Sequence, residues 1–253
     1  MSISVITVRD LCFSYNGQAI LKQVRFDVPE RGFVALIGPN GGGKTTLLKL
    51  MLGLLLPNQG NISIFGKPPR ETAHRVGYVP QDIGVNKRFP VSVTDVVLMG
   101  CLKPGKRCFR YSRKDRIAAQ KVLEELGMWE FRDRRIGALS GGQHQKVFIA
   151  RAIVSEPEIL FLDEPTASVD SKGQREFYDL LKILNQNATI VMVSHDLMVI
   201  SSYVKSVACV NTFVHYHGSA EVTQEMVDMY CCPVELVTHG NLPHRVLKKH
   251  EDF

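Results

Sequence analysis

Alternating apolar and polar positions at the start of the chain predict a pair of antiparallel strands. Residues 3–15 (ISVITVRDLCFSY) and 19–28 (AILKQVRFDV) alternate with the period of two expected of half-buried strands. Two later runs, residues 33–37 (FVALI) and 159–162 (ILFL), are apolar throughout, which is typical of parallel strands buried on both faces. Short strands near 207–211 and 213–218 are expected to complete this second sheet. The pattern predicts an α/β core beside an antiparallel β layer.

A different periodicity occupies the middle of the chain. Residues from about 84 to 145 are more helical in pattern, and residues 115–128 (DRIAAQKVLEELGM) form an amphipathic helix that should end near Gly127. A length of 253 residues fits one large α/β domain with an inserted subdomain. We therefore predict a core domain over residues 1–215, a helical insertion at about 84–145, and a C-terminal tail over 216–253 that contains histidines.

A glycine-rich segment follows the apolar run at residues 33–37 and opens into a predicted helix. It matches G-x-x-x-x-G-K-[ST] in the context that this pattern requires, which is a strand, a turn and a helix start. Glycines let successive N–H groups converge on a polyphosphate at a helix N-terminus, where the helix dipole also favours an anion. Lys44 would neutralise the β and γ phosphates, and the Thr45 hydroxyl would bind Mg²⁺, a hard cation. The predicted nucleotide-binding segment is Gly38, Pro39, Asn40, Gly41, Gly42, Gly43, Lys44, Thr45 and Thr46.

Two adjacent carboxylates end the second apolar run. Asp163 and Glu164 follow residues 159–162 directly, at the carboxyl end of a predicted parallel strand. Adjacent carboxylates repel each other unless a cation or phosphate chemistry uses them, so an ordinary acidic turn is the weaker interpretation. Asp163 is suited to holding Mg²⁺ through water, and Glu164 to polarising an attacking water.

Between these two motifs lies a second candidate anion site. Residues 139–143 read LSGGQ, and five specified residue types recur by chance only about once in a million positions. Glycines at the start of the helix that continues through QHQKVFIARAI would expose N–H groups to an anion. The residues concerned are Leu139, Ser140, Gly141, Gly142 and Gln143.

With these motifs in this order, residues 5 to 215 resemble the ATPase subunit of ATP-binding-cassette transporters. The resemblance implies a P-loop NTPase (RecA-like) core with an N-terminal antiparallel β layer and an inserted α-helical subdomain carrying the signature LSGGQ. It implies that Tyr15 stacks on adenine, although a structural strand-end tyrosine is the alternative. It places Gln81 beside Mg²⁺ and the attacking water, so the implied Mg²⁺ set is Thr45, Gln81 and Asp163.

The same resemblance assigns further positions and a partner. His195 matches the switch histidine, so the implied catalytic set is Glu164, His195, Lys44 and Gln81. Ser168 and Asp170 match a loop that crosses between subunits. The signature segment is implied to bind ATP held by a second copy in a head-to-tail dimer, so a monomer should hydrolyse ATP slowly. Lys146 departs from the usual arginine and loses a planar fork of donors.

Charge and apolar runs limit the remaining classes. The net charge is +6, and a basic cluster lies just after residues 87–100. A solvated face is one interpretation of this cluster, and attraction to anionic lipid beside a membrane partner is another. Nucleic acid is not expected, because no aromatic platform or reading motif accompanies the cluster. No run approaches the roughly 18 apolar residues needed to cross a bilayer, and the six cysteines lack regular spacing and are interpreted as thiols.

The segment KRFPVSVTDVVLMG (87–100) and the last residues look like those of ATPases from importers of zinc, manganese or iron(II). Five of the eight histidines fall in the last 39 residues, but their spacing is irregular, so metal sensing and solvated histidines both remain interpretations. The implied protein is a peripheral ATPase on the cytoplasmic face of the membrane. Its implied partners are a second ATPase subunit in a homodimer, two multi-span permease subunits and an extracytoplasmic metal-binding protein. A siderophore or haem importer and a soluble iron–sulfur assembly ATPase are the alternatives.

Overall fold

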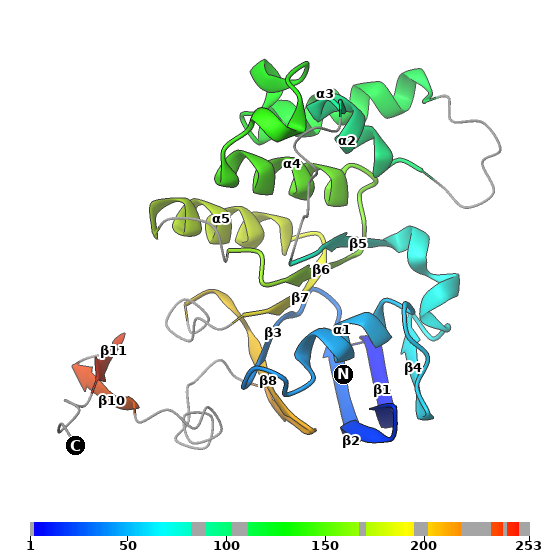
Figure 1. Cartoon of the computed structure of the whole chain (residues 1–253), viewed down its shortest axis with the longest axis vertical. Helices are drawn as coiled ribbons and strands as arrows, with labels where there is room; N and C mark the ends of the chain where they lie inside the picture. The colour runs from blue at the N-terminus through cyan, green and yellow to red at the C-terminus, as the bar shows by residue number, and fades with distance from the viewer. Residues whose placement is uncertain are drawn as a thin grey trace.

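The computed structural model describes residues 3–81, 90–102, 111–166, 171–194, 202–218, 234–239 and 242–247. Within them there are three sheets, of three, six and two strands, and a layer of helices (Figure 1). The antiparallel sheet has the order β2-β1-β4, and the large sheet has the order β5-β6-β7-β3-β8-β9. Only β9 runs antiparallel to its neighbour in the large sheet. The predicted α/β core and its separate β layer are therefore confirmed.

The antiparallel layer follows directly from the alternation at the start of the chain. Its strands are β1 (Ser4–Tyr15), β2 (Gln18–Pro29) and β4 (Gln59–Ile64). Ile6, Val8 and Leu11 are fully buried, while the intervening polar residues face outward. This layer packs with helix α1 (Lys44–Met51) against one face of the large sheet.

The large sheet consists of β3 (Phe33–Ile37), β5 (Val76–Val79), β6 (Ile159–Asp163), β7 (Thr189–Val193), β8 (Ser206–Asn211) and β9 (Phe213–His217). Its inner strands are buried on both faces, whereas the edge strands β5 and β9 are partly exposed. In β3, Phe33 and Ala35 join one core cluster, whereas Val34 and Leu36 join the other. Alternate residues of one strand therefore serve two cores, which explains why the run is apolar throughout.

The second face of the large sheet is covered by helices. These are α2 (Val93–Met99), α3 (Arg113–Glu125), α4 (Gly141–Ile153) and α5 (Ser171–Leu184). The predicted amphipathic helix is confirmed as α3, and its chain reaches Gly127 with a positive φ of 64° just beyond the helix end. Figure 1 shows α2, α3 and α4 gathered on the side of the sheet away from the β layer.

Short 3₁₀ turns connect these elements at Pro69–Glu71, Ala73–Arg75, Trp129–Phe131 and Ile136–Ala138. Strand β9 continues to His217, across the predicted boundary at residue 215. Beyond it, β10 (Val234–His239) and β11 (Leu242–Leu247) pair as an antiparallel hairpin inside the segment predicted only as a tail. Among the residues described, no helix is long and apolar enough to cross a membrane.

Candidate functional site

The glycine-rich loop between β3 and α1 has a backbone that only glycine adopts easily. Gly38, Gly41 and Gly43 have φ angles of 144°, 78° and 103°. A Cβ on Gly38 would lie 2.1 Å from the carbonyl oxygen of Val210, and one on Gly42 would lie 2.7 Å from it. Strand β8 therefore lies directly against the loop. Glycine is required there both for the backbone conformation and because a side chain would clash with the Val210 carbonyl.

Lys44 turns back into this loop. Its Nζ donates to the carbonyl oxygens of Gly38, at 3.0 Å, and Pro39, at 2.9 Å, and the side chain is buried. Burial lowers the pKa of Lys44, while the nearby Glu164 and Asp163 carboxylates act in the opposite direction. A buried ammonium at the start of a helix, beside a glycine-rich loop, is arranged to receive an anion.

Thr45 and Asp163 bring two oxygens together across the sheet end. The Thr45 hydroxyl donates to Oδ1 of Asp163 at 3.1 Å, and Asp163 is only 2% exposed. Burial raises the pKa of Asp163, and Glu164 adds to the effect, while the Thr45 hydrogen bond opposes it. A buried carboxylate beside a hydroxyl is a donor set that fits Mg²⁺, because hard oxygen ligands suit this cation and it would offset the buried charge.

Glu164 occupies an unusual backbone position at the end of β6. Its φ is 46°, in the left-handed region, and its N–H donates to the carbonyl oxygen of Val193 at 3.1 Å. Gln81, just beyond β5, donates from Nε2 to Oε2 of Glu164 at 2.7 Å. Non-glycine residues in this region are strained and concentrate at functional sites. The ends of β5, β6 and β7 thus fix this carboxylate.

Tyr15 lies at the end of β1, at the mouth of the β1–β2 turn. Its ring is 44% exposed and packs edge-on against Phe13, with centroids 4.8 Å apart. The start of β2 reaches the glycine-rich loop, since a Cβ on Gly43 would lie 2.9 Å from Cδ2 of Leu21. An exposed aromatic face therefore stands on a hairpin that touches the phosphate loop, although sequence patterns alone did not identify the Leu21 contact.

Helix α4 begins within residues 139–143, at Gly141, as predicted. Ser140 caps the helix in a reciprocal box: its Oγ accepts from the Gln143 N–H at 3.4 Å, and its N–H donates to Oε1 of Gln143 at 3.0 Å. The N–H groups of Gly141 and Gly142 lie between these two bonds at the helix start. The capping box therefore positions two glycine amides at an accessible helix N-terminus.

The two candidate anion sites lie in different layers of the molecule. Residues of α1 pack into the core on the β-layer side of the large sheet, whereas residues of α4 pack into the core on the helical side. Lys44 is thus grouped with Thr45, Asp163, Glu164 and Gln81, and the signature residues form a separate site. The structure brings together the first group and leaves the second at the surface.

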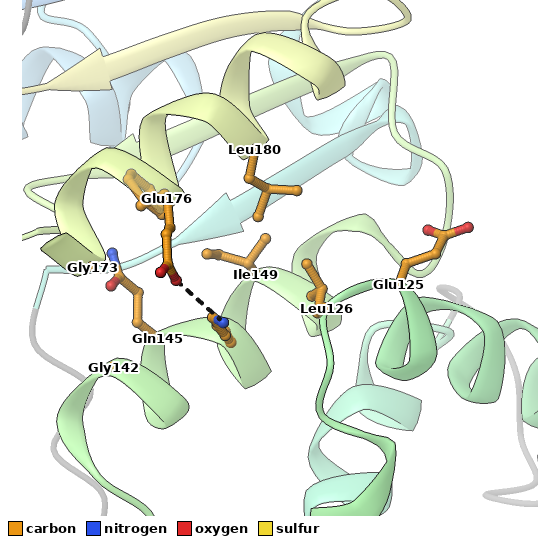
Figure 2. A pocket seen from close by; sticks show the side chains of 10 residues that line it. Glu125, Leu126, Gly142, Gln145, Ile149, Gly173, Glu176 and Leu180 are labelled. Carbon is orange, nitrogen blue, oxygen red and sulfur yellow. Dashed lines mark ion pairs between the residues drawn. The ribbon is translucent and has the colours of Figure 1, made fainter.

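A hollow between α4 and α5 adjoins the signature segment (Figure 2). Leu126, Ile149 and Leu180 contribute its apolar walls, and Lys146 lies 3.9 Å from the Glu176 carboxylate across it. Both charged side chains are about half exposed, so this ion pair contributes little to stability. Lys146, the departure noted in the sequence, therefore makes a weak link between α4 and α5.

A stronger link joins α4 to the segment after the paired carboxylates. Gln145 is buried, and its Nε2 donates to the carbonyl oxygen of Pro165. No sequence motif singles out Gln145 beyond its place in the helix that follows the LSGGQ segment. His195, Ser168 and Asp170 lie outside the described residues; Ser194, just before His195, is buried and its N–H donates to Leu36 at 3.2 Å.

Comparison with known proteins places this geometry in a family. The family described as "ABC transporter" matches residues 21–167. A zinc uptake system ATP-binding protein of Listeria monocytogenes is 40% identical over 87% of this chain and 88% of its own length. A zinc transport system ATP-binding protein of Treponema pallidum is 40% identical over 88% of this chain and 85% of its own.

Solved structures give the same result. A chain described as part of a metal-chelate type ABC transporter, in an inward-facing conformation, superposes with a TM-score of 0.82, 29% identity and 96% coverage of both chains. An ATP-binding cassette in its ADP conformation gives a TM-score of 0.77 at 23% identity, over 92% of this chain and 96% of its own, which supports the fold alone. The chain belongs to the ABC transporter family, as one of its ATP-binding, ATP-hydrolysing subunits.

Proposed function

We propose that this chain hydrolyses ATP to drive uptake of a divalent transition metal, with zinc the favoured ion, through a separate membrane permease. The observation that supports hydrolysis is the contact between Gln81 and Glu164 beside the Thr45–Asp163 pair. The support for zinc comes from the two relatives that are named for zinc transport at 40% identity. Manganese and iron(II) are the competing ions.

Within this proposal each residue of the phosphate-loop group has one role. The loop amides and Lys44 hold the β and γ phosphates. Thr45 and Asp163, with Gln81 nearby, hold Mg²⁺, which supplies charge neutralisation for the phosphates when bound. Glu164 accepts the proton of the attacking water, and its position is fixed by Gln81 and by the Val193 carbonyl.

His195, Ser168 and Asp170 complete the proposed set by position in the sequence. His195 follows β7, at the same carboxyl edge as Glu164, and would contact the γ phosphate. Ser168 and Asp170 would lie between two copies of the chain. Tyr15 would stack on adenine.

The proposed assembly is a head-to-tail homodimer beneath two permease subunits at the cytoplasmic face of the membrane. Leu54 and Leu56 are 61% and 63% exposed, beside a hollow lined by Leu54, Pro69, Ala73, Val76 and Tyr78. Tyr78 belongs to β5, which leads directly to Gln81. A permease seated on this apolar surface would be coupled to the nucleotide site through β5. An extracytoplasmic binding protein would deliver the ion.

The decisive experiment is ATP hydrolysis by the chain reconstituted with its permease in vesicles. Binding protein loaded with zinc, manganese or iron(II) is added in turn. Stimulation by zinc alone would support the proposal, and Leu56→Glu should keep basal hydrolysis but lose the stimulation. A hydrolysis rate that is the same with and without the permease and the metal would overturn the proposal and favour a soluble ATPase of iron–sulfur cluster assembly.

A chelate importer is the second candidate, because a solved metal-chelate type transporter superposes on nearly the whole chain. The same vesicles distinguish the two. Stimulation by binding protein carrying an iron chelate or haem, and not by binding protein carrying a bare ion, would support this alternative.

A further inference from the structure

Two histidines project from one face of the edge strand of the large sheet. His215 and His217 are two residues apart in β9, so they share a face, and β9 is the last strand of the sheet. Their partners across the ladder are Cys209 and Val207, which belong to the core on the helical side. His215 is exposed and His217 is half-buried.

The opposite face of β9 fixes the orientation of this strand. Tyr216, between the two histidines, stacks on Phe26 of β2 with ring centroids 5.9 Å apart. Its hydroxyl donates to Oγ of Ser206 at 2.9 Å. Because Tyr216 is held on one face by a ring contact and a hydrogen bond, His215 and His217 are held together on the other.

Imidazoles two residues apart on a strand suit a transition-metal ion. Their Cα atoms are about 6.6–6.8 Å apart in an extended strand, and imidazole is a ligand for zinc, copper and nickel at about 2.0–2.1 Å for zinc. Among the residues that the structure describes, no three histidine, cysteine or acidic side chains are grouped to hold an ion. The pair would therefore provide two ligands, with water completing the coordination.

The hairpin that carries these histidines also braces the phosphate loop. Thr212, the turn residue between β8 and β9, donates its N–H to the carbonyl oxygen of Gly42 at 3.2 Å. Its own carbonyl oxygen accepts from the N–H of Lys22 at 2.8 Å. The Val210 carbonyl abuts Gly38 and Gly42. A ligand that stiffens β9 at His215 therefore acts three residues from Thr212, which is hydrogen-bonded to Gly42 of the phosphate loop.

We propose that His215 and His217 bind a divalent transition-metal ion of the zinc class, and that this ion changes the affinity of the phosphate loop for ATP. The proposal does not depend on which substrate the transporter carries, because it follows from imidazole chemistry and from the Thr212–Gly42 hydrogen bond. The site is a regulatory one, separate from the Mg²⁺ position at Thr45 and Asp163.

The first test measures zinc binding to the full-length chain without nucleotide, by competition with a chromophoric zinc indicator. Chelation makes the second imidazole an intramolecular ligand, so His215→Asn or His217→Asn alone should weaken binding by about a hundredfold. The double variant should be only slightly weaker than either single one. Equal thermal unfolding midpoints without metal would show that the variants are folded.

The controls separate this pair from the other histidines. His74→Asn removes an exposed histidine far along the chain from the pair. The triple variant His239→Asn, His244→Asn and His250→Asn removes the histidines of the last residues. Both should bind zinc with the affinity of the wild type. Wild-type affinity in the His215 and His217 variants, or its loss in the controls, would overturn the proposed site.

The second test measures the dissociation constant of a fluorescent ATP analogue in excess Mg²⁺, with and without zinc. Zinc should shift this constant at least threefold in the wild type and leave the double variant unchanged. Zinc binding without such a shift, or an equal shift in both proteins, would refute the coupling to the phosphate loop.

Discussion

The phosphate-loop end and the signature end of this chain are both helix N-termini rich in glycine, yet they are built differently. At the first, Lys44 donates to the Gly38 carbonyl oxygen, Thr45 donates to Asp163, and strand β8 closes one side of the loop. At the second, Ser140 and Gln143 satisfy each other, and the glycines between them face outward. The first site has its charged groups in place, whereas the second presents only backbone dipoles.

This difference indicates which groups each of the two helix N-termini lacks, and therefore which groups a second copy of the chain would have to supply. In the proposed function, Lys44 neutralises the phosphates of the nucleotide and the two carboxylates serve Mg²⁺ and the attacking water, while this end presents no second anion-binding helix N-terminus to the same phosphates. Two exposed amides can complete an anion site but cannot form one alone. Because the two ends lie in different layers of one chain, the economical arrangement is that a second copy supplies its signature end to this phosphate loop.

The largest expected effect comes from removing the proposed base at the phosphate-loop end. Glu164→Gln keeps the size and the Gln81 contact but cannot accept a proton, so hydrolysis should fall by about 10²–10⁴. ATP binding should persist, and an ATP-bound dimer should accumulate on size-exclusion chromatography. Glu158→Gln, at the other end of β6, is the matched control. Hydrolysis at the parental rate by Glu164→Gln would show that the base lies elsewhere.

The second-largest effect is expected when a variant of the phosphate loop is mixed with a variant of the signature segment. Lys44→Ala and Gly142→Asp should each be inactive, the second because a carboxylate repels the γ phosphate where a Cβ itself meets no atom within 4 Å. In a dimer of the two variants, the intact Lys44 of one chain faces the intact signature segment of the other, so one of the two sites is complete. Equal co-expression makes about half of the dimers mixed, so about a quarter of wild-type activity should be recovered.

Gly142→Asn is the control for that mixture, since it adds the same bulk without charge and should retain more activity than Gly142→Asp. A mixture as inactive as its parents, with mixed dimers present, would argue that each chain uses its own signature segment.

A smaller effect, on ATP affinity, is expected from substitutions of Tyr15. Tyr15→Ala should raise the dissociation constant for ATP about tenfold, because stacking on a base contributes about 1–3 kcal/mol. Tyr15→Phe keeps the ring and should bind ATP like the wild type in a fluorescence titration. If Tyr15→Ala binds ATP as tightly as the wild type, the ring of Tyr15 does not stack on adenine and serves only to pack against Phe13.

The smallest effect concerns the stability of the phosphate-loop end without ligands. Burial raises the pKa of Asp163 above its ordinary 3.8. The folded chain then holds this proton more tightly than the unfolded chain, so stability falls as pH rises from that value to the folded pKa and stays lower above it. Asp163→Asn removes this loss, and its melting temperature at pH 7 should be about 2–4 °C higher.

In buffer without nucleotide or Mg²⁺, that difference in melting temperature should vanish near pH 4, grow as the pH rises to the folded pKa of Asp163, and stay constant above it. A variant less stable than the wild type at pH 7 would mean that the Thr45 hydrogen bond outweighs the burial of the charge.

Local patterns predicted the elements that this comparison uses. The apolar runs of β3 and β6, the glycine-rich loop and the signature helix were all predicted, because strand burial, turn chemistry and capping depend on neighbouring residues. The positions of Tyr15 and Gln81 came from resemblance to a family. The contact between Gln81 and Glu164 agrees with that placement.

Features that depend on distant pairing could not be predicted in this way. The glycines at 38 and 42 indicate a close approach, but nothing local identifies Val210 as the neighbour, because that depends on the register of β8 against β3. The left-handed φ of Glu164 accompanies a hydrogen bond from its N–H to the Val193 carbonyl oxygen on another strand, and the residue type alone does not indicate either feature. The β10–β11 hairpin was missed for another reason: residues 240–241 read Gly-Asn, a common two-residue hairpin signature between the paired ends His239 and Leu242, but this segment was interpreted only as a tail.

The position of strand β8 beside Gly38 also bears on how the protein is made. Strand β3 is paired on both sides by strands that come much later in the sequence, β7 and β8. On the ribosome the glycine-rich loop emerges early, but the Val210 carbonyl and the Thr212 amide that complete its surroundings emerge only after most of the chain has been translated. A nascent chain therefore acquires its nucleotide pocket late, when nearly all of the core that supports the pocket has been synthesised.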